Sequence, residues 1–430
     1  MSPPALARRR RLAWLIAASL LALAGLLCAL GAWRVALAFG SRAPAAPRGT
    51  LTIVSSLPLA GYDPPIARAM RLRLDQAGGR ACAAQYALRY ESWDDASAAA
   101  GDWDPAVEAA NARKAAAEGS IIAYLGPFNS GAAKISIPIL NRAGPLVMLG
   151  LANSYAGLTK RAGAAPGEPE VYYPTGLRNY ARLNMTDDVQ GGVDALFLRD
   201  RLRARTVFVL DDGQPYGAGI ADTFQAAAGP LGLTVLGRAT IDPNASDYQT
   251  LMGQISLSNG GRPPDAIFAG MLADSNAAQV LKDKVAVMGD NTRVSYMGPA
   301  GIRVQAFIEG AGPRAAEGVY ASQPGLPFEQ LPAAAQQFKA AYQARYGGQL
   351  NDPYAIYGYE AMSVTLAAIE RVCAAGGSPA DRRAVRDAVF STRNFSGALG
   401  VWSFDANGDI SLTGTSFYQV QGGQFVAVGR

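Results

Sequence analysis

The chain has 430 residues, a length that predicts two lobes or domains, because one hydrophobic core rarely serves so many residues. Half of the residues are hydrophobic and 17% are charged, which is typical of a folded globular protein and excludes a disordered one. The five arginines among residues 1–40 account for the whole net charge of +5. The rest of the chain is therefore neutral and offers no basic surface for a nucleic acid.

Residues 1–40 are predicted to be a membrane anchor or a signal segment. Four arginines at 8–11 precede the uncharged stretch 12–33, which as a helix is long enough to cross a hydrocarbon core of about 30 Å. Arginines on this side favour a cytoplasmic N-terminus, so the rest of the chain is expected outside the cytoplasm. Ala-Leu-Ala at 36–38 resembles a signal-peptide cleavage site, which leaves cleavage as the alternative to an uncleaved anchor. Residues 41–49 are expected to form a linker.

Beyond residue 49, short runs rich in β-branched and aromatic residues alternate with longer amphipathic runs. The expected strands are 51–57, 86–93, 121–125, 145–151, 206–210, 234–241, 266–269 and 294–297. The expected helices include 107–118, 132–142, 189–202, 219–228, 248–257, 331–346 and 354–373. Such alternation predicts an α/β fold whose parallel sheets are covered by helices on both faces. In such folds small ligands bind at the carboxyl ends of the strands.

The sequence contains no histidine, which excludes a Ser–His–Asp triad, a Cys–His dyad and imidazole metal ligands. It also contains no nucleophile elbow, Walker A loop or dinucleotide-binding fingerprint. The acid pairs at 94–95, 187–188 and 211–212 are interpreted as solvated loop acids or helix caps rather than a calcium site. We therefore expect no enzyme, no metal and no cofactor; an α/β hydrolase-like enzyme is the alternative from another class.

Small and hydroxylated residues follow two of the expected strands, as Asn129-Ser130-Gly131 and Ala152-Asn153-Ser154. The first of these also begins an expected helix, whose free N–H groups and dipole favour an anion. Such chain ends suit catalysis by a serine, phosphate binding or the capture of a small polar ligand. The missing catalytic partners favour capture.

Segments along the chain resemble, in family order, the type I periplasmic binding proteins of ABC transporters, specifically the branched-chain amino acid (Leu/Ile/Val-binding-protein-like) receptors. They include SSLPLAG (55–61), LDQAGG (74–79), the stretch 187–225, DAIFAGMLADSNAAQVLK (265–282), YMGPAGI (296–302), AAEGVYASQP (315–324) and FDANGD (404–409). The resemblance extends from about residue 51 to 430. It implies two doubly wound parallel-sheet lobes, joined by a three-strand hinge and preceded here by a transmembrane helix, with a ligand cleft that closes by hinge motion.

A loop-rich stretch, residues 163–180, is interpreted as the point where the chain leaves the first lobe. With the resemblance, this implies crossings between the lobes near residues 175–180, 300–304 and 390–398. The expected segments are 50–177 and 303–393 for the first lobe, and 178–302 and 394–430 for the second.

In the first lobe, the resemblance implies that Ser130, Ala152 and Ser154 bind the α-carboxylate of an amino acid, with Asn129 and Asn153 beside them. The alternative for Ser130 is an ordinary helix cap that satisfies its own helix. Capping and binding are compatible, because the backbone donors of the helix remain free for a ligand.

In the second lobe, the resemblance implies that Asp274 binds the α-ammonium group and that Tyr216 closes over the ligand, with Tyr248 near the cleft. The alternatives are a helix cap for Asp274, a turn aromatic for Tyr216 and helix packing for Tyr248. Compared with the family, the stretch after residue 61 is short, and Tyr62 is the candidate for the side chain that packs on the ligand. This departure leaves open a member that binds nothing.

Cys82 and Cys373 each lie just beyond an expected helix, at residues 64–77 and 353–372 respectively. An oxidising exterior permits a disulfide between them, and two separate buried thiols are the alternative. The resemblance would place both cysteines in the first lobe, which favours the pairing.

The resemblance implies a monomeric extracytoplasmic receptor that captures an amino acid or an amide-like small molecule and delivers it to an ABC permease. The alternative with the same fold is a membrane-tethered sensory module that regulates a partner protein. Neither role requires a cofactor.

Overall fold

The computed structural model describes residues 48–429, apart from 60–64, 101, 349 and 351, together with Trp14 and Gly25. Residues 48–430 form one compact unit. The remainder of the predicted membrane segment 12–33 lies outside the described residues, as does Tyr62. Among the described residues, no helix combines the length and the apolar character that a membrane crossing requires.

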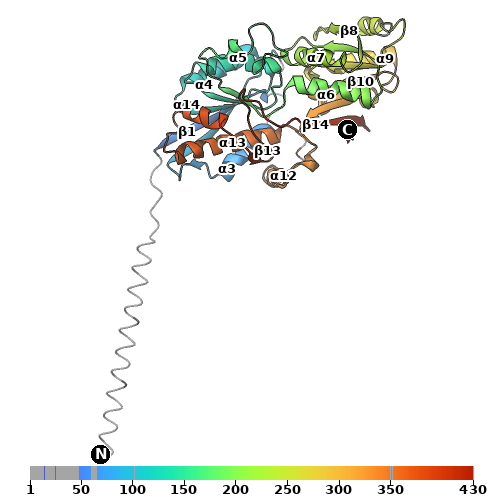
Figure 1. Ribbon diagram of the computed structural model, residues 1–430. Coiled ribbons are helices and arrows are strands. Elements are labelled where there is room, and N and C mark those ends of the chain that lie inside the picture. Colours follow the sequence, from blue (N-terminus) through green and yellow to red (C-terminus); the bar gives the residue numbers. More distant parts are fainter. Residues whose placement is uncertain are drawn as a thin grey trace, which may run out of the picture. The chain divides into compact units, whose positions relative to one another are not determined.

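Within the described residues, the first lobe is built on a six-stranded sheet (Figure 1). Its strands, in order across the sheet, are β2 (Arg80–Ala81), β3 (Tyr86–Asp94), β1 (Gly49–Leu57), β4 (Ile121–Leu125), β5 (Val147–Gly150) and β6 (Tyr180–Arg182). Its helices are α3 (Pro65–Gln76), α4 (Pro105–Ala117), α5 (Ser130–Asn141), α12 (Ala333–Tyr346), α13 (Ala355–Ala374) and α14 (Arg382–Phe390). All pairs are parallel except β2 with β3, as the alternation of strands and helices predicts.

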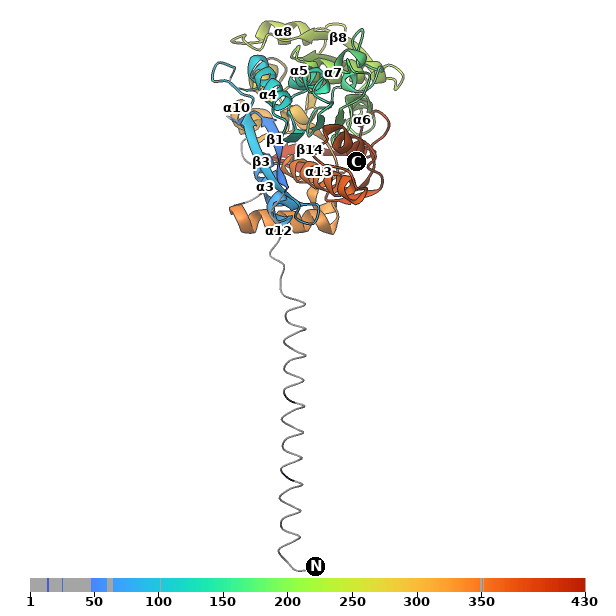
Figure 2. The ribbon, with the colours of Figure 1, turned by 90° about the vertical axis from the view of Figure 1, so that its left-hand side faces the viewer.

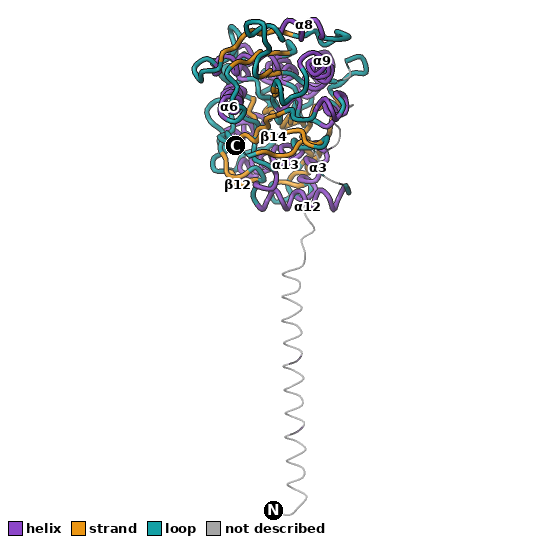
Figure 3. Tube along the Cα trace, turned by 90° about the vertical axis from the view of Figure 1, so that its right-hand side faces the viewer, coloured by secondary structure: helices purple, strands orange, loops and turns teal. Residues whose placement is uncertain are grey.

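The second lobe is built on a seven-stranded sheet, with α6 and α9 placed around it in Figure 3. Its strands, in order, are β15 (Gln424–Val428), β14 (Thr415–Gln421), β11 (Tyr320–Pro324), β10 (Ser295–Gly298), β9 (Ala266–Gly270), β7 (Thr206–Asp211) and β8 (Thr234–Thr240). Its helices are α6 (Asp187–Asp200), α7 (Pro215–Ala228), α8 (Gln249–Ile255), α9 (Ala278–Met288), α10 (Gln305–Ala311) and α11 (Pro313–Ala316). The tail adds β14 and β15 as antiparallel strands at one edge.

Each sheet has a hydrophobic core on both faces, which explains the uninterrupted apolar runs of its strands. In β4 every residue of the sequence IIAYL is buried. Ile122 packs into the core beneath α3 and α13, and Tyr124 packs into the opposite core beneath α4 and α5. Figures 1 and 2 show these helix pairs on the two sides of the first sheet. The second sheet has the same arrangement, with separate cores under α6 and α7 and under α8, α9 and α10.

The chain passes between the lobes later than the sequence predicted. The chain passes from the first lobe to the second after β6, and from the second lobe back to the first after β11. It enters the second lobe again between Ile410, which packs in the core of the first lobe, and β14. The hairpin of β12 (Phe395–Gly397) and β13 (Gly400–Trp402) belongs to the first lobe, because Trp402 packs into the core against α13. Strands of three residues, such as β6, β12 and β13, carry no periodic signal. The expected crossings near 175–180, 300–304 and 390–398 were therefore placed too early.

The structure has a disulfide between Cys82 and Cys373, whose Cα atoms are 5.6 Å apart. Cys82 lies in the turn between β2 and β3, and Cys373 lies near the end of α13. The Cys82 N–H also donates a hydrogen bond of 2.8 Å to the Glu370 carboxylate. The bond joins positions 291 residues apart, so it ties together the two segments of the first lobe that the second lobe separates.

Arg182, at the end of β6, is fully buried and forms an ion pair with Asp409, with 2.7 Å between Nε and Oδ1. Its Nη1 donates to the backbone carbonyls of Tyr155 at 2.9 Å and Asn153 at 3.3 Å, and its Nη2 donates to the Thr159 hydroxyl. Burial by itself would raise the pKa of Asp409, but the Arg182 guanidinium outweighs burial and lowers that pKa. Each nitrogen of this buried cation therefore has a partner.

Candidate functional site

A cavity of about 40 Å³ lies between the lobes, next to the carboxyl ends of strands from both sheets. From the first lobe and the first crossing, it is lined by Phe128, Asn129, Ser130, Ala152, Ser154, Asn184 and Tyr354. From the second lobe, it is lined by Gln190, Tyr216, Leu272, Ala300, Gly301 and Val304. One water needs roughly 10–15 Å³, so this cavity has room for a few non-hydrogen atoms.

The N-terminus of α5 supplies hydrogen-bond donors to one side of this cavity. Ser130 is the first residue of the helix, and the side chain of Asn129 at the N-cap makes no capping hydrogen bond. The Tyr155 N–H donates to Ser130 Oγ at 3.3 Å, so the Ser130 hydroxyl retains its own proton for another acceptor. A helix start with an uncapped side chain and a free hydroxyl favours a carbonyl or carboxylate oxygen of a ligand.

The loop that follows β5 contributes Ala152 and Ser154 to the cavity, while Asn153 has a different role. Asn153 Nδ2 donates to the Phe128 carbonyl at 2.9 Å, and its Oδ1 accepts from the Tyr180 hydroxyl at 3.2 Å. Both ends of this carboxamide are therefore used inside the first lobe. Asn153 holds the two first-lobe loops of the cavity together, and it does not line the cavity itself.

Four polar side chains of the cavity have a buried atom without a hydrogen-bond partner among the described residues. These atoms are Asn129 Oδ1, Ser154 Oγ, Asn184 Oδ1 and Gln190 Oε1. Their residues are between 0 and 8% exposed. Because more than nine in ten buried polar groups in folded proteins are hydrogen-bonded to protein or to water, four such atoms around one cavity mark it as a place for water or for a polar solute.

Tyr216 lines the cavity from α7 of the second lobe and is 9% exposed. Its hydroxyl oxygen accepts a hydrogen bond of 3.1 Å from the Gly301 N–H. A Cβ atom on Gly301 would lie only 2.8 Å from the Tyr216 ring and 2.5 Å from the Met271 carbonyl oxygen. Gly301 is therefore required for this close approach, and it fixes the ring at the cavity wall.

Asp274 does not line the cavity, so the structure does not support the contact with an ammonium group that the resemblance implied. It lies in the turn Ala273–Ala277 before α9 and is exposed to solvent. Its carboxyl group is close to the Asp102 carboxyl of the first lobe. Partial loss of hydration and this neighbouring acid raise the pKa of Asp274 to about 7.

Tyr248 also lies away from the cavity, in the core beneath α8 and α9. Its hydroxyl donates to the Asp242 carbonyl at 2.7 Å and accepts from Asn276 Nδ2 at 3.1 Å. Its backbone N–H donates to the Asp283 carboxylate at 2.7 Å. The packing interpretation of Tyr248 therefore describes it better than a place near the ligand.

Asn184 and Gln190 are cavity residues that the sequence did not single out. Asn184 lies in the crossing between β6 and α6, and Gln190 lies in the first turns of α6. Asn184 Nδ2 donates to the Ala152 carbonyl at 2.9 Å, and Gln190 Nε2 donates to the Ser322 hydroxyl at 2.8 Å. The available signal was an asparagine between the apolar residues Leu183 and Met185, directly after the last strand of the first sheet.

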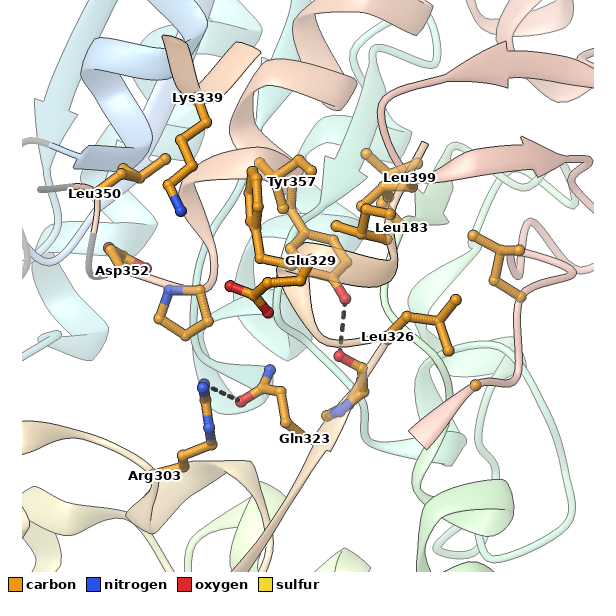
Figure 4. A pocket seen from close by; sticks show the side chains of 18 of the residues that line it. Leu183, Arg303, Gln323, Leu326, Glu329, Lys339, Leu350, Asp352, Tyr357 and Leu399 are labelled. Atoms are coloured by element: carbon orange, nitrogen blue, oxygen red, sulfur yellow. Dashed lines mark hydrogen bonds between the residues drawn. The ribbon is translucent and has the colours of Figure 1, made fainter. Parts of the chain in front are cut away.

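A larger pocket, of about 530 Å³, lies at the crossings themselves (Figure 4). Its walls include Leu183, Leu326 and Leu412, one from each crossing. Arg303 donates to Gln323 Oε1 at 3.4 Å and lies 3.7 Å from the centre of the Tyr418 ring. The charged lining residues comprise two of each sign, namely Arg303, Lys339, Glu329 and Asp352. Segments that connect the two lobes therefore form part of its walls.

Comparison with known families gives one match over most of the chain. A family model described as "Periplasmic binding protein" matches residues 49–424. Among curated proteins, a Leu/Ile/Val-binding protein, BraC3, from Rhizobium johnstonii is 24% identical over 389 residues, which is 88% of this chain and 93% of that protein. A leucine-, isoleucine-, valine-, threonine- and alanine-binding protein from Pseudomonas aeruginosa is 27% identical over 245 residues, 54% of this chain and 58% of that protein.

Solved structures show the same fold. The leucine binding protein LivK from Thermotoga maritima has a TM-score of 0.70 at 22% identity and covers 88% of this chain and 98% of its own. LivJ from Streptococcus pneumoniae, in complex with isoleucine, has a TM-score of 0.70 at 19% identity and covers 88% and 100%. A solute binding protein from R. palustris, in complex with benzoate, has a TM-score of 0.68 at 19% identity and covers 89% and 96%.

Proposed function

Because the chain belongs to the periplasmic binding protein family and is a solute-binding receptor, we propose that it captures an amino acid or a similar small polar molecule between its lobes. It then delivers this solute to an ABC permease in the membrane. Membership of the family implies a location outside the cytoplasm. We further propose that residues 12–33 tether the receptor to the membrane and that it acts as a monomer.

The observation that carries this proposal is the cavity between the lobes. Ser130, Ala152 and Ser154 from the first lobe line it together with Tyr216 from the second lobe. The four unpartnered polar atoms around it are the kind of group that a bound polar solute satisfies. The curated relatives that bind branched-chain amino acids support a solute of similar size.

Different cavity residues contact different parts of the solute. The Ser130 hydroxyl and the start of α5 bind the carboxylate or carbonyl end of the solute, and Ser154 contributes a second hydroxyl from the neighbouring loop. Tyr216 covers the solute from the second lobe, where Gly301 holds it in position. Because residues of both lobes meet only when the lobes are together, a solute that contacts both favours the closed arrangement.

Entry of the solute requires the lobes to separate, since the cavity of about 40 Å³ holds only a few non-hydrogen atoms. The crossings after β6, after β11 and before β14 are the segments that can absorb such a rotation. Hinge closure then removes the solute from water, and a permease can distinguish the closed receptor from the open one.

A thermal-shift screen of the full-length chain tests this function. The panel contains the standard amino acids, small amides, urea and short carboxylates. A solute at one hundred times its dissociation constant is expected to stabilise the folded state by about 2.7 kcal/mol, which raises the melting temperature visibly. An unchanged melting temperature across the whole panel contradicts solute capture.

A further inference from the structure

The larger pocket at the crossings has a largely buried cation at one end. Arg303 lies between β10 and α10, and its Nε atom is buried without a hydrogen-bond partner among the described residues. Its Nη1 donates to Gln323 Oε1 over a long 3.4 Å, and its guanidinium carbon lies 3.7 Å from the centre of the Tyr418 ring. Burial lowers the pKa of Arg303, because loss of hydration disfavours the charged form. Unlike Arg182, this cation therefore retains a buried N–H group for another acceptor.

Gln323, in β11, adds a second donor at the same end of the pocket. It is 4% exposed, and its Oε1 accepts from Arg303, which has only donors, so the orientation of the carboxamide is fixed. Its Nε2 atom is buried without a partner among the described residues, and in Figure 4 this nitrogen points toward the middle of the pocket. An amide nitrogen carries two hydrogens, so one stays free when the Tyr354 hydroxyl, which lies close to Gln323, accepts the other.

The acidic residues of the pocket do not neutralise Arg303 through an ion pair. Asp352 accepts a hydrogen bond of 2.7 Å from the Tyr354 N–H, and burial raises the pKa of this carboxyl to about 6, a rise that Arg303 offsets only in part. Glu329 is exposed to solvent, and Lys339, half-buried on α12, adds a second cation to the lining. Among the described residues, no carboxylate lies within ion-pair distance of the Arg303 guanidinium. The positive charge at this end of the pocket is therefore unpaired.

The rest of the wall is largely apolar. Leu183, Ile356 and Leu399 line it and are between 2 and 8% exposed. Leu326 also lines it and is 43% exposed, which leaves apolar surface for a ligand to cover. In the view of Figure 4, Arg303 lies at one end of the pocket, and Leu183 and Leu399 lie at the other. The volume of about 530 Å³ is within the range of roughly 300–1,000 Å³ that small-molecule sites have.

We infer that the pocket at the crossings is a second ligand site and that it binds a small carboxylate with an apolar body. The carboxylate accepts from Arg303 Nε and Gln323 Nε2, and the apolar body contacts Leu183, Leu326 and Leu399. This site is separate from the interlobe cavity, so the inference goes beyond the proposed function and does not depend on which solute that cavity takes.

Both parts of such a ligand contribute to its binding. A carboxylate supplies the charge that a buried guanidinium lacks, and hydrogen bonds between these two groups are stronger than those between neutral groups. A neutral amide of the same shape supplies no charge, so the cation stays uncompensated. A carboxylate without an apolar body leaves the leucines of the wall in contact with water.

The test is titration calorimetry of the full-length chain with three compounds, namely 3-phenylpropionate, 3-phenylpropionamide and propionate. The first has both the charge and the apolar body, the second lacks the charge, and the third lacks most of the body. We expect 3-phenylpropionate to bind at least tenfold more tightly than either of the others. The inference is overturned if the amide binds as tightly as the acid, or if 3-phenylpropionate does not bind. Neither result affects solute capture in the interlobe cavity, which the thermal-shift screen tests.

A variant of the buried cation locates the bound acid. Arg303→Gln removes the charge and is expected to lower the affinity ratio of 3-phenylpropionate to 3-phenylpropionamide at least tenfold. A purely structural role of Arg303 would change both affinities alike and leave this ratio unchanged. Arg345→Gln is the matched control, because it loses the same charge from an exposed pair with Asp75 outside the pocket. An unchanged ratio in Arg303→Gln with a natural circular dichroism spectrum, or an equal change in the control, overturns the inference. If Arg303→Gln does not fold, the comparison of acid and amide on the natural chain decides.

Discussion

Two polar centres, one around Arg182 and one around the interlobe cavity, lie close together in this protein. They differ in whether their buried polar atoms have hydrogen-bond partners. Around Arg182, a full charge is buried and each of its nitrogens has a partner, in Asp409, Thr159 or a backbone carbonyl. Around the interlobe cavity no lining residue among those described is charged, yet four polar atoms have no partner. Asn153 touches both centres, since its carbonyl accepts from Arg182 and its side chain holds the cavity loops.

The difference separates groups that serve the fold from groups that serve binding. A buried polar group that is fully satisfied contributes to stability and has no capacity left for a solute. A buried polar group without a partner costs stability in the empty protein and recovers that cost when a solute arrives. This criterion favours the small cavity, with four such atoms, over the larger pocket at the crossings, where Arg303 Nε and Gln323 Nε2 are the buried polar atoms without a partner among the described residues.

Removing the cation from the satisfied centre is expected to give the largest effect. Arg182→Met removes the nearer counter-charge of the buried Asp409 carboxylate and leaves only Lys160, whose Nζ lies 3.9 Å from Oδ2, so we expect a loss of about 3 kcal/mol of unfolding free energy. Urea denaturation of the variant measures this loss. Arg161→Met is the matched control, because its pair with Glu170 is 79% and 55% exposed and such pairs contribute about 0–1 kcal/mol. Equal losses in the two variants would contradict the comparison.

The disulfide is expected to give the next largest effect, and it tests the fold without touching either polar centre. Cys82→Ser opens the link between the two first-lobe segments, so the unfolded chain gains entropy and stability falls by about 2–4 kcal/mol. Reduction of the natural chain should lower the melting temperature to that of the variant. Affinity for the solute, measured below both melting temperatures, should remain the same.

At the unsatisfied centre, Ser130→Ala should lower the affinity for the solute, and it should also lower stability, because the Tyr155 N–H loses its acceptor. Loss of the hydroxyl removes one hydrogen bond to the solute, and we expect the affinity to fall about tenfold, or 1.4 kcal/mol. Ser136→Ala is the control on the same helix: Ser136 is buried and its hydroxyl donates to the Ala132 carbonyl at 2.9 Å, but it does not line the cavity. Calorimetry with the solute found by thermal shift should show full affinity for the control, and an equal fall in both variants would place the solute elsewhere.

Acid should weaken the satisfied centre by a smaller amount. Because Arg182 lowers the pKa of Asp409 in the folded protein, the stability that this carboxylate provides is fully present above its ordinary pKa of about 3.9. It is lost as the pH falls through the lower value in the folded state. Below about pH 4 the natural chain should therefore lose more unfolding free energy than Asp409→Asn does. Parallel stability curves for the two proteins would mean that the pair does not titrate as described.

Local features of the sequence were sufficient for part of the first-lobe side of the cavity, but not for Phe128, Asn184 or Tyr354. Ser130 and the Ala152–Ser154 loop follow β4 and β5, and strand ends can be recognised from short apolar runs with small residues behind them. The alternation of strands and helices was likewise sufficient for two α/β lobes. Tyr216, beside a proline that begins α7, lies at the start of an amphipathic run, where a strand end and a helix start meet.

The second-lobe side of the cavity depended on the tertiary structure. Asp274 follows β9 as the resemblance implied, but it lies in the turn Ala273–Ala277, close to Asp102. Asn184 reaches the Ala152 carbonyl only because the chain crosses after β6 and not earlier. Sequence alone thus determined the two lobes and the loops at their strand ends, since these follow from hydrophobic period and local turns. Which side chains of the two lobes face one another was decided by three crossings far apart in the chain, and no local pattern encodes such contacts.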